Sequence, residues 1–245
     1  MLKILQLSDI HLQESLNATL YQVSPWKNLQ ALLLKIKHRM EDIDAIFLSG
    51  DISHDGTVGS YQHIAENLQV FAKPIYWFAG NHDVSRLMQA TLNDYSCFTP
   101  LSSLTLENWQ FLVLNTVREG CDEGYLIENT KPLIQTHTFC AVLMHHHPVP
   151  VGSALIDKYK LQNPEVLRIF LLQQKKRPQV IITGHVHGGY QTNFDGIPVI
   201  SSPATCFQFP KETTTLAIEA KGGCTFWQFH KNGTFNYEYV YTCSS

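Results

Sequence analysis

Residues 2–12 of the chain read LKILQLSDIHL, and this stretch indicates both a fold class and the position of a site. Leu2 to Leu7 form a short apolar run that predicts a buried strand. The polar residues Ser8, Asp9 and His11 follow directly at its end. Because loops at the carboxyl ends of strands converge on ligands in α/β sheets, the stretch predicts a strand that carries Asp9 and His11 into a binding site.

The chain then continues as apolar strands that alternate with amphipathic helices. Ser24-Pro25 predicts a helix start, with an N-cap serine and a proline in the first turn, and apolar residues follow at helical spacing. A strand over residues 43–48, a helix over 58–71 and a strand over 74–78 are expected next. This series favours an α/β core with a partly parallel sheet.

The later part of the chain is richer in strands and favours a second sheet packed on the first. One further helix is expected at residues Pro164–Gln173. No repeat, low-complexity segment or linker divides the sequence, which predicts one domain over residues 1–245. The later strands are expected at residues 110–114, 138–144, 180–182, 198–200, 213–218, 224–229 and 234–241.

The composition argues against several classes of protein. A chain of 245 residues with 44% hydrophobic and 16% charged residues is typical of a globular protein. The net charge of -3 and the lack of a Lys/Arg block argue against a nucleic-acid partner. Apolar runs such as residues 31–34 are too short to span a membrane. Six cysteines without CxxC spacing, and an N-terminus without the apolar core of a signal peptide, predict a reduced, cytoplasmic protein.

Polar clusters close five of the expected strands, and together they offer carboxylate, imidazole and amide groups without a cysteine. Such a mixed set suits a borderline to hard divalent metal such as Mn, Fe or Zn. Each cluster alone is compatible with an ordinary turn or cap, but five in succession at strand ends favour one common site. The clusters are Ser8-Asp9-Ile10-His11, Gly50-Asp51, Gly80-Asn81-His82-Asp83, His145-His146-His147 and Gly184-His185-Val186-His187.

In this order the clusters match the motif series D-x-H, GD, GNH, H, GHxH, and the chain resembles the calcineurin-like metallophosphoesterase superfamily. The segments ILQLSDIHL, SYQHIAENL, MHHHPVPVG and SSPATCFQF make it most similar to the bacterial class III cyclic-nucleotide phosphodiesterases. The resemblance extends from residue 2 to the C-terminus. It implies a metal-dependent phosphoric diester hydrolase with a four-layer α/β/β/α sandwich, in which two mixed sheets are flanked by helices.

The resemblance also implies two divalent transition metal ions, Fe or Mn most readily and Zn as an option. The implied role of His82 is to contact the phosphate, stabilise the transition state and protonate the leaving 3'-oxygen. Asp83 would either orient His82 or cap the following helix. Asp9, His11 and His187 would hold the first ion and Asn81, His145 and His185 the second, while Asp51 would bridge both. Asp51, Asn81 and His82 are the implied catalytic residues, and substrate contacts are expected at His11, Asp51, Asn81, His82 and His187.

The histidine triplet leaves two alignments open. Aligned without a gap on the family pattern M-H-H-P-P-x-P, His145 is the ligand, His146 hydrogen-bonds a backbone group that steadies the site, and His147 is a partly exposed loop residue. With a gap before the proline, His146 becomes the ligand. The ungapped alignment is preferred because Met144 and the P-x-P-x-G tail both stay in register.

Other positions keep two interpretations. His54 either borders the pocket or sits at a helix entry, and Thr205 and Cys206 either pack in the core or approach the substrate. The segment between Leu114 and His145 has little room for the helix that such proteins often carry there, since residues 131–136 lack a helical pattern.

The expected reaction is hydrolysis of 3',5'-cyclic AMP to 5'-AMP by a metal-bridging hydroxide. One alternative is a broad-specificity phosphodiesterase or phosphomonoesterase acting on glycerophosphodiesters or 2',3'-cyclic nucleotides. Another is a non-catalytic scaffold, against which the full ligand set and His82 argue. The expected partner is a small-molecule phosphodiester or nucleotide, and the expected state is a monomer or homodimer.

Overall fold

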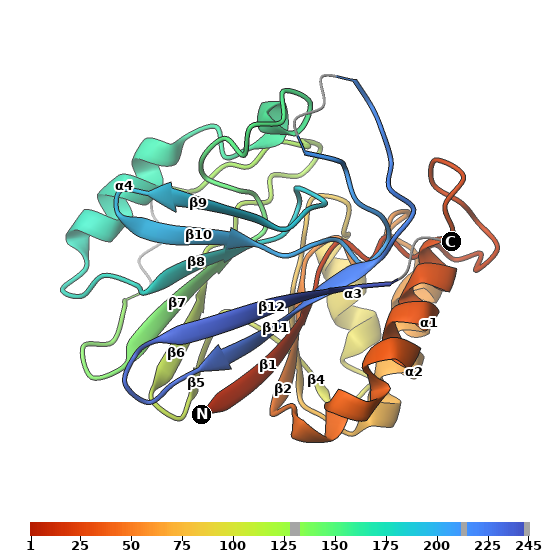
Figure 1. Ribbon diagram of the computed structural model, residues 1–245, viewed down its shortest axis with the longest axis horizontal. Coiled ribbons are helices and arrows are strands. Elements are labelled where there is room, and N and C mark those ends of the chain that lie inside the picture. Colours follow the sequence, from red (N-terminus) through yellow and green to blue (C-terminus); the bar gives the residue numbers. More distant parts are fainter. Residues whose placement is uncertain (128–132, 212–214, 243–245) are drawn as a thin grey trace.

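A computed structural model describes residues 1–127, 133–211 and 215–242 of the chain, and it contains two six-stranded mixed sheets that pack face to face (Figure 1). In the first sheet the order is β12-β11-β1-β2-β3-β4, with parallel pairing from β1 to β4 and antiparallel pairing of β11 with β1 and β12. Its strands are β1 (Leu2–Leu7), β2 (Ala45–Ser49), β3 (Ile75–Phe78), β4 (Phe98–Pro100), β11 (Gly223–Phe229) and β12 (Phe235–Tyr241).

The second sheet has the order β5-β6-β7-β8-β10-β9. Its central strands β6, β7, β8 and β10 are parallel, and antiparallel strands form its two edges. The strands are β5 (Ser103–Leu106), β6 (Trp109–Val113), β7 (Phe139–Met144), β8 (Val180–Thr183), β9 (Tyr190–Phe194) and β10 (Ile197–Ser201).

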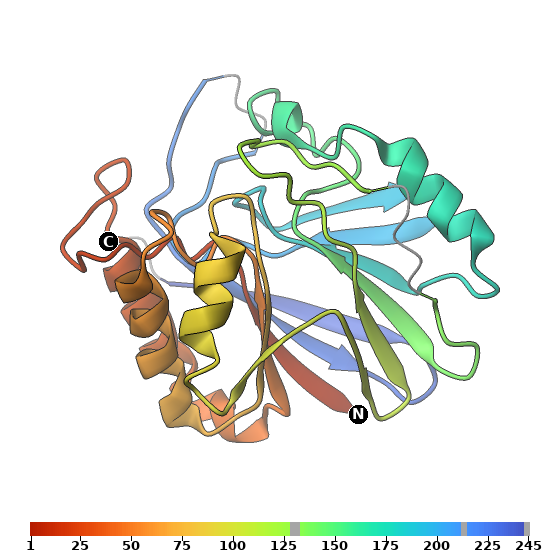
Figure 2. The ribbon, with the colours of Figure 1, turned by 180° about the vertical axis from the view of Figure 1, so that it is seen from behind.

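Helices cover the outer faces of both sheets, which confirms the expected α/β/β/α layers (Figures 1 and 2). Three helices lie on the first sheet: α1 (Pro25–Ile36), α2 (Val58–Leu68) and α3 (Ser85–Leu92). One helix, α4 (Pro164–Gln173), lies on the second. Short 3-10 helices are η1 (Lys37–Asp42), η2 (Gln69–Phe71) and η3 (Ile156–Tyr159).

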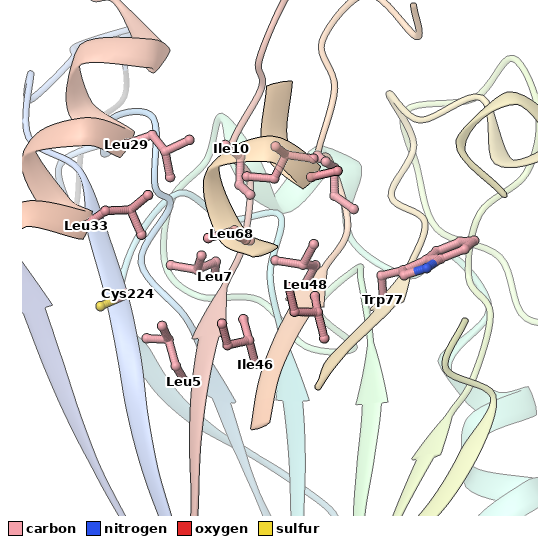
Figure 3. Packing of buried hydrophobic residues seen from close by; sticks show 14 of the residues in the cluster. Leu5, Leu7, Ile10, Leu29, Leu33, Ile46, Leu48, Leu68, Trp77 and Cys224 are labelled. Atoms are coloured by element: carbon pink, nitrogen blue, oxygen red, sulfur yellow. The ribbon is translucent and has the colours of Figure 1, made fainter. Parts of the chain in front are cut away.

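The pleat of β1 divides its side chains between two cores. Leu5 and Leu7 face the helices and pack with Leu29 of α1, as Figure 3 shows, while Leu2 and Ile4 face the second sheet. Burial of one such side chain contributes about 1.5–3 kcal/mol to folding. Helix α1 begins where the sequence predicts, because the Ser24 hydroxyl accepts a hydrogen bond from the Lys27 N–H.

Most of the expected elements are confirmed, with shifts of a few residues at their ends. A helix after Asp83 was expected without bounds and is α3, while β4, β5, β9, η1 and η3 were not expected. The strand expected over residues 213–218 is wrong for its described part, since residues 215–218 form no strand and only Glu219 makes an isolated bridge to Gln208. Within the described residues, no helix is long and apolar enough to cross a membrane.

Candidate metal centre

The five polar clusters lie together because the strands that carry them end at one edge of the two sheets. The clusters follow β1, β2 and β3 in the first sheet and β7 and β8 in the second. Backbone hydrogen bonds tie the loops to each other: the Asp9 N–H donates to the Gly50 carbonyl at 3.0 Å, and the Gly184 N–H donates to the His145 carbonyl at 3.1 Å. The loop after β1 is therefore joined to the loop after β2, and the loop after β8 is joined to the loop after β7.

The backbone is strained where the candidate ligands sit. Their φ angles of 48–69° lie in the left-handed region, which costs an ordinary residue roughly 1–2 kcal/mol. Strained backbone of this kind occurs mostly at functional sites, where the surrounding structure keeps it in place. The residues are Asp9, His11, Asp51, His185 and His187.

The glycines of the motifs are required by close approach to the candidate ligands. A Cβ atom at Gly50 would collide with the His145 ring, and one at Gly80 would collide with the Asp51 carboxylate. A Cβ atom at Gly184 would collide with the Ser8 hydroxyl beside Asp9. The motifs GD, GNH and GHxH therefore contain glycine because the loop backbone packs directly onto donor side chains.

One group of donor atoms surrounds the Asn81 side chain. Its Oδ1 atom lies 3.2 Å from Nε2 of His145 and 3.1 Å from Nδ1 of His185. The Asp51 Oδ2 atom lies 3.3 Å from the same His145 nitrogen. Two donors that each lie about 2.1 Å from one ion stand roughly 3.0–3.4 Å apart at octahedral or tetrahedral angles, so these spacings suit a common metal.

A second group lies on the other side of Asp51. The Nε2 atoms of His11 and His187 are 3.1 Å apart, and Asp51 Oδ2 lies 3.5 Å from His11 Nε2. Asp9 Oδ1 lies 3.8 Å from His187 Nε2. The Asp51 carboxylate is therefore close to donor atoms of both groups.

The tautomers of two histidines show that this donor set fits a cation. His145 Nδ1 lies 3.0 Å from the Ser49 carbonyl and His187 Nδ1 lies 3.1 Å from the Phe207 carbonyl. A carbonyl only accepts, so Nδ1 carries a proton in each ring and Nε2 faces the cluster. When Nε2 of His145 is deprotonated, lone pairs of His145, Asn81 and Asp51 converge on one point, an arrangement that a positive ion stabilises.

The cluster is also short of positive charge. Burial raises the pKa of Asp9 to about 7. Burial of Asp51 acts in the same direction but is outweighed by the charge of His145, which holds the pKa of Asp51 well below its usual value. Burial would lower the pKa of His145, yet Asp51 raises it to about 9. Without metal a proton on His145 offsets one carboxylate, and the site has the charge to accept divalent ions.

His82 and His54 lie at the open side of the cluster. The His82 N–H donates to Asp51 Oδ1 at 2.9 Å, and the His82 ring contacts the His11 ring edge to face at 4.8 Å. The His54 ring stacks on His82 with centroids 4.9 Å apart, and its Nδ1 lies 3.3 Å from Nδ1 of His11. Of the two interpretations of His54, the pocket-bordering one is confirmed, since the N-cap of α2 is Thr57.

The helix-capping interpretation of Asp83 is wrong, because its carboxylate fastens two motif loops to each other, and the orientation of His82 by Asp83 stays a prediction. The Asp83 carboxylate accepts hydrogen bonds from the backbone N–H groups of Ile52, Ser53 and Gly80 at 2.9–3.2 Å. The N-cap of α3 is Val84, without a side-chain cap. Asp83 therefore holds the loop of Asn81 and His82 against the loop of Asp51.

The triplet points its three rings in different directions. His145 faces the cluster, whereas His146 donates from Nε2 to the Asp122 carbonyl at 3.1 Å and accepts at Nδ1 from the Thr116 hydroxyl at 2.8 Å. This confirms the expected backbone bond of His146 and leaves it no nitrogen for a metal. The partly exposed position expected for His147 is wrong: the residue is 1% exposed, and its Nε2 donates to Asp157 at 3.3 Å.

The loop that follows β10 approaches the site from behind. The Cys206 Sγ atom lies 3.6 Å from His187 Nδ1, while the Thr205 hydroxyl donates to the Gly223 carbonyl. Both side chains are buried and neither lines the cavity, although the Cys206 Sγ atom lies close enough to His11 and His187 to share a metal ion with them. In the segment between Leu114 and His145, residues 115–127 and 133–138 contain no helix, and part of the stretch 131–136 lies outside the described residues.

The cluster forms the floor of a cavity of about 350 Å³ whose far wall is apolar. His11, Asp51, Asn81, His82, His185 and His187 line the polar end, together with His54. Sequence reasoning missed the other end, because the aromatic residues of SSPATCFQF were not assigned a role and the remaining lining residues belong to no motif. It is lined by Leu20, Tyr21, Leu155, Ile156, Phe207 and Phe209, among others.

Comparisons with known proteins give matches over most of the chain. The family model Calcineurin-like phosphoesterase matches residues 2–189. The 3',5'-cyclic adenosine monophosphate phosphodiesterase CpdA of Escherichia coli (strain K12) is 30% identical, over 96% of this chain and 88% of its own. A 3',5'-cyclic-nucleotide phosphodiesterase of Nostoc is 30% identical, over 96% and 90% of the two chains.

A solved structure supports the fold alone. The purple acid phosphatase PPD1 of yellow lupin superposes with a TM-score of 0.63 at 12% identity, covering 97% of this chain and 51% of that chain. Members of the matched family use divalent metal ions, and the His and Asp groups described above could hold them. The resemblance expected from the motifs is confirmed: the chain is a phosphoesterase enzyme that belongs to the calcineurin-like phosphoesterase family.

Proposed function

We propose that the chain is a binuclear-metal phosphodiesterase that hydrolyses 3',5'-cyclic AMP to 5'-AMP. One observation carries the proposal: the Asp51 carboxylate lies between His11 and His145, at 3.5 and 3.3 Å, with His82 beside it at the open side of the cluster. The choice of cyclic nucleotides is supported by the relatives of Escherichia coli and Nostoc, which match almost the whole chain.

In this proposal the two donor groups hold one ion each. Iron and manganese suit the nitrogen and oxygen donors best, and zinc suits them as well. When bound, two divalent ions supply a nucleophile from water near neutral pH and offset the charge of the phosphate oxygens. The ligands of the first ion are Asp9, His11 and His187, those of the second are Asn81, His145 and His185, and Asp51 is common to both.

The side chains of the protein then divide the remaining work. Asn81 and His82 leave β3 side by side, so the amide that holds an ion and the imidazole beside the phosphate are placed by one turn. Water would add to phosphorus and release one proton to solvent, the bond from phosphorus to the 3'-oxygen would break, and His82 would give a proton to that oxygen and regain one from solvent. The product keeps its phosphate on the 5'-oxygen, which gives 5'-AMP.

A broad-specificity phosphodiesterase is the alternative, and one observation favours it. Tyr21, which lines the pocket, is 57% exposed, so a large substituent of the phosphate can extend past it into solvent. Such an enzyme would act on glycerophosphodiesters or 2',3'-cyclic nucleotides with the same metal centre.

We also propose that the enzyme acts on small molecules in the cytoplasm. This is supported by the free thiols of the described cysteines, which suit a reducing compartment. The cysteines are Cys97, Cys121, Cys140, Cys206 and Cys224.

The proposal is tested by kinetics on three diesters. With manganese supplied, kcat/KM is measured for 3',5'-cyclic AMP, bis(p-nitrophenyl) phosphate and a glycerophosphodiester. We expect the highest value for cyclic AMP, and 5'-AMP as the sole nucleotide product by chromatography. A much lower kcat/KM for cyclic AMP than for the glycerophosphodiester would contradict the substrate and favour the alternative.

A further inference from the structure

The aromatic end of the pocket is continuous with the candidate metal centre. The ring of His187 packs against Phe207 at 4.8 Å and against Phe209 at 4.9 Å. Phe207 in turn meets the ring of Tyr21 edge to face at 5.6 Å and 86°. A chain of ring contacts therefore leads from a candidate ligand to the exposed rim of the cavity.

Tyr21 differs from the other two aromatic residues because it is not packed into the fold. Phe207 is buried in a small cluster with Val23, Ala204 and Cys206, whereas 57% of Tyr21 is exposed while it lines the cavity. Its apolar ring surface thus faces the pocket and solvent rather than a core. An aromatic side chain with an apolar body and a polar tip is well suited to such a position at a ligand site.

The backbone that holds Tyr21 is strained. Leu20 and Val23 exchange two backbone hydrogen bonds, of 2.8 and 2.9 Å, across a two-residue turn. The residues between them, Tyr21 and Gln22, have φ angles of 49° and 66°, in the left-handed region. Turns of this geometry favour Asn-Gly, which adopts it with less strain. The Tyr21-Gln22 pair adopts this strained turn nevertheless, and the turn places the aromatic ring of Tyr21 at the cavity.

From this geometry we infer that Tyr21 is a specificity-determining residue that stacks against the planar base of a nucleotide whose phosphate lies at the metal centre. The inference rests on the proposed function for the position of the phosphate. Leu155 and Ile156 also line the cavity and add apolar surface to it. The volume of about 350 Å³ is in the range of sites that enclose a small ligand.

Stacking of a base on an aromatic side chain tolerates different bases, because every base has a π-face. The inferred subsite therefore selects a substrate with a base over a diester without one, and it discriminates weakly between adenine and guanine. Its ligand class is a nucleoside phosphate rather than a glycerol phosphate.

Direct binding tests the inference without turnover. Isothermal titration calorimetry of the manganese-supplemented protein measures Kd for 5'-AMP and for ribose 5-phosphate, which has the same sugar and phosphate but no base. We expect the wild type to bind 5'-AMP about tenfold more tightly, the scale of one base stacked on one ring. Tyr21→Ala should remove this preference, and Tyr21→Phe should keep it.

A matched variant distinguishes the effect of the Tyr21 ring on binding from the effect of the turn that carries it. Gln22→Gly relaxes the neighbouring left-handed position and keeps the ring, so the Kd ratio should stay within about twofold of the wild type. An unchanged ratio in Tyr21→Ala, or an equal loss in Gln22→Gly, would overturn the inference. Failure of the proposed function gives a different result, because cyclic AMP would then not be hydrolysed. The Kd ratio and its dependence on Tyr21 are measured without turnover and would still test the inference.

Discussion

The two ends of the pocket are built in opposite ways. At the metal-binding end Asp9, Asp51 and His145 are buried, and hydrogen bonds between neighbouring loops hold them in place. At the aromatic end Tyr21 is largely exposed and stands on a two-residue turn at the rim. The comparison teaches that the groups suited to phosphate ester cleavage are buried and held by hydrogen bonds, whereas the residue at the rim is exposed to whatever substituent the phosphate carries.

The largest effect is expected at the residue shared by both donor groups. Asp51→Asn keeps the size of the side chain and its tolerance of the left-handed backbone but removes the charge that faces His11 and His145. We expect kcat to fall by about 10³-fold or more and the metal content to drop below two ions per chain. Steady-state kinetics and elemental analysis of the purified protein measure both quantities.

Asp195→Asn provides the matched control for this change. Asp195 also has a left-handed backbone, with φ of 50°, but it lies on the surface beside Arg168. Its replacement should leave kcat and metal content as in the wild type. Full metal content and activity in Asp51→Asn would show that the floor of the pocket does not depend on this carboxylate.

The next largest effect is expected at His82, where loss of catalysis can be distinguished from loss of metal binding. His82→Ala removes the ring beside His11 and leaves the proposed ligands in place. We expect kcat to fall by about 10²–10⁴-fold with unchanged metal content, since a positioned acid contributes on that scale. The same kinetics and elemental analysis apply, with His38→Ala on the exposed surface as control. Loss of metal together with activity would make His82 a ligand instead.

A smaller effect is expected one layer behind the floor, at His146. His146→Ala leaves the Asp122 carbonyl and the Thr116 hydroxyl without their buried partner. We expect a loss of about 1–3 kcal/mol in the free energy of unfolding and about tenfold weaker metal binding, because groups behind a ligand orient it. Urea unfolding and metal titration measure these changes, and His145→Ala should lose metal far more strongly. Equal metal loss in the two variants would contradict the orientations of the two rings.

The same contrast explains what could be predicted from the sequence. The polar end was predictable because its donors follow buried strands in five short motifs, and Gly50, Gly80 and Gly184 occupy positions where a Cβ atom cannot fit. The aromatic end was not predictable, since no local rule favours Tyr21 and Gln22 in a turn that suits Asn-Gly.

Elements of the fold were missed for equally local reasons. The bounds of helix α3 were not predicted, because it begins after Val84, which gives no side-chain cap. Strand β4 has only three residues, and its pairing with β3 depends on tertiary contacts. The apolar and polar residues around 215–218 satisfy the strand pattern, yet in the described chain no neighbouring strand pairs with them.

The smallest effect on turnover is expected at His147, which links the two ends of the pocket. Its Nε2 donates to Asp157 of η3, and the same carboxylate accepts hydrogen bonds from the N–H groups of Val151 and Gly152. Burial lowers the pKa of His147, so the ring is neutral and acts as a simple donor. The pocket-lining residue Ile156 adjoins Asp157 in this short helix.

His147→Ala should therefore loosen the apolar wall and spare the metal floor. Loss of one buried hydrogen bond and of ring packing lowers the free energy of unfolding by about 1–3 kcal/mol, which urea unfolding measures. Metal content should stay unchanged, and kcat on bis(p-nitrophenyl) phosphate should stay within about twofold of the wild type. His147→Gln keeps a donor and should recover part of the lost stability. A loss of metal in His147→Ala would mean that the wall and the floor are one rigid unit, and the division of the pocket into two ends would then be wrong.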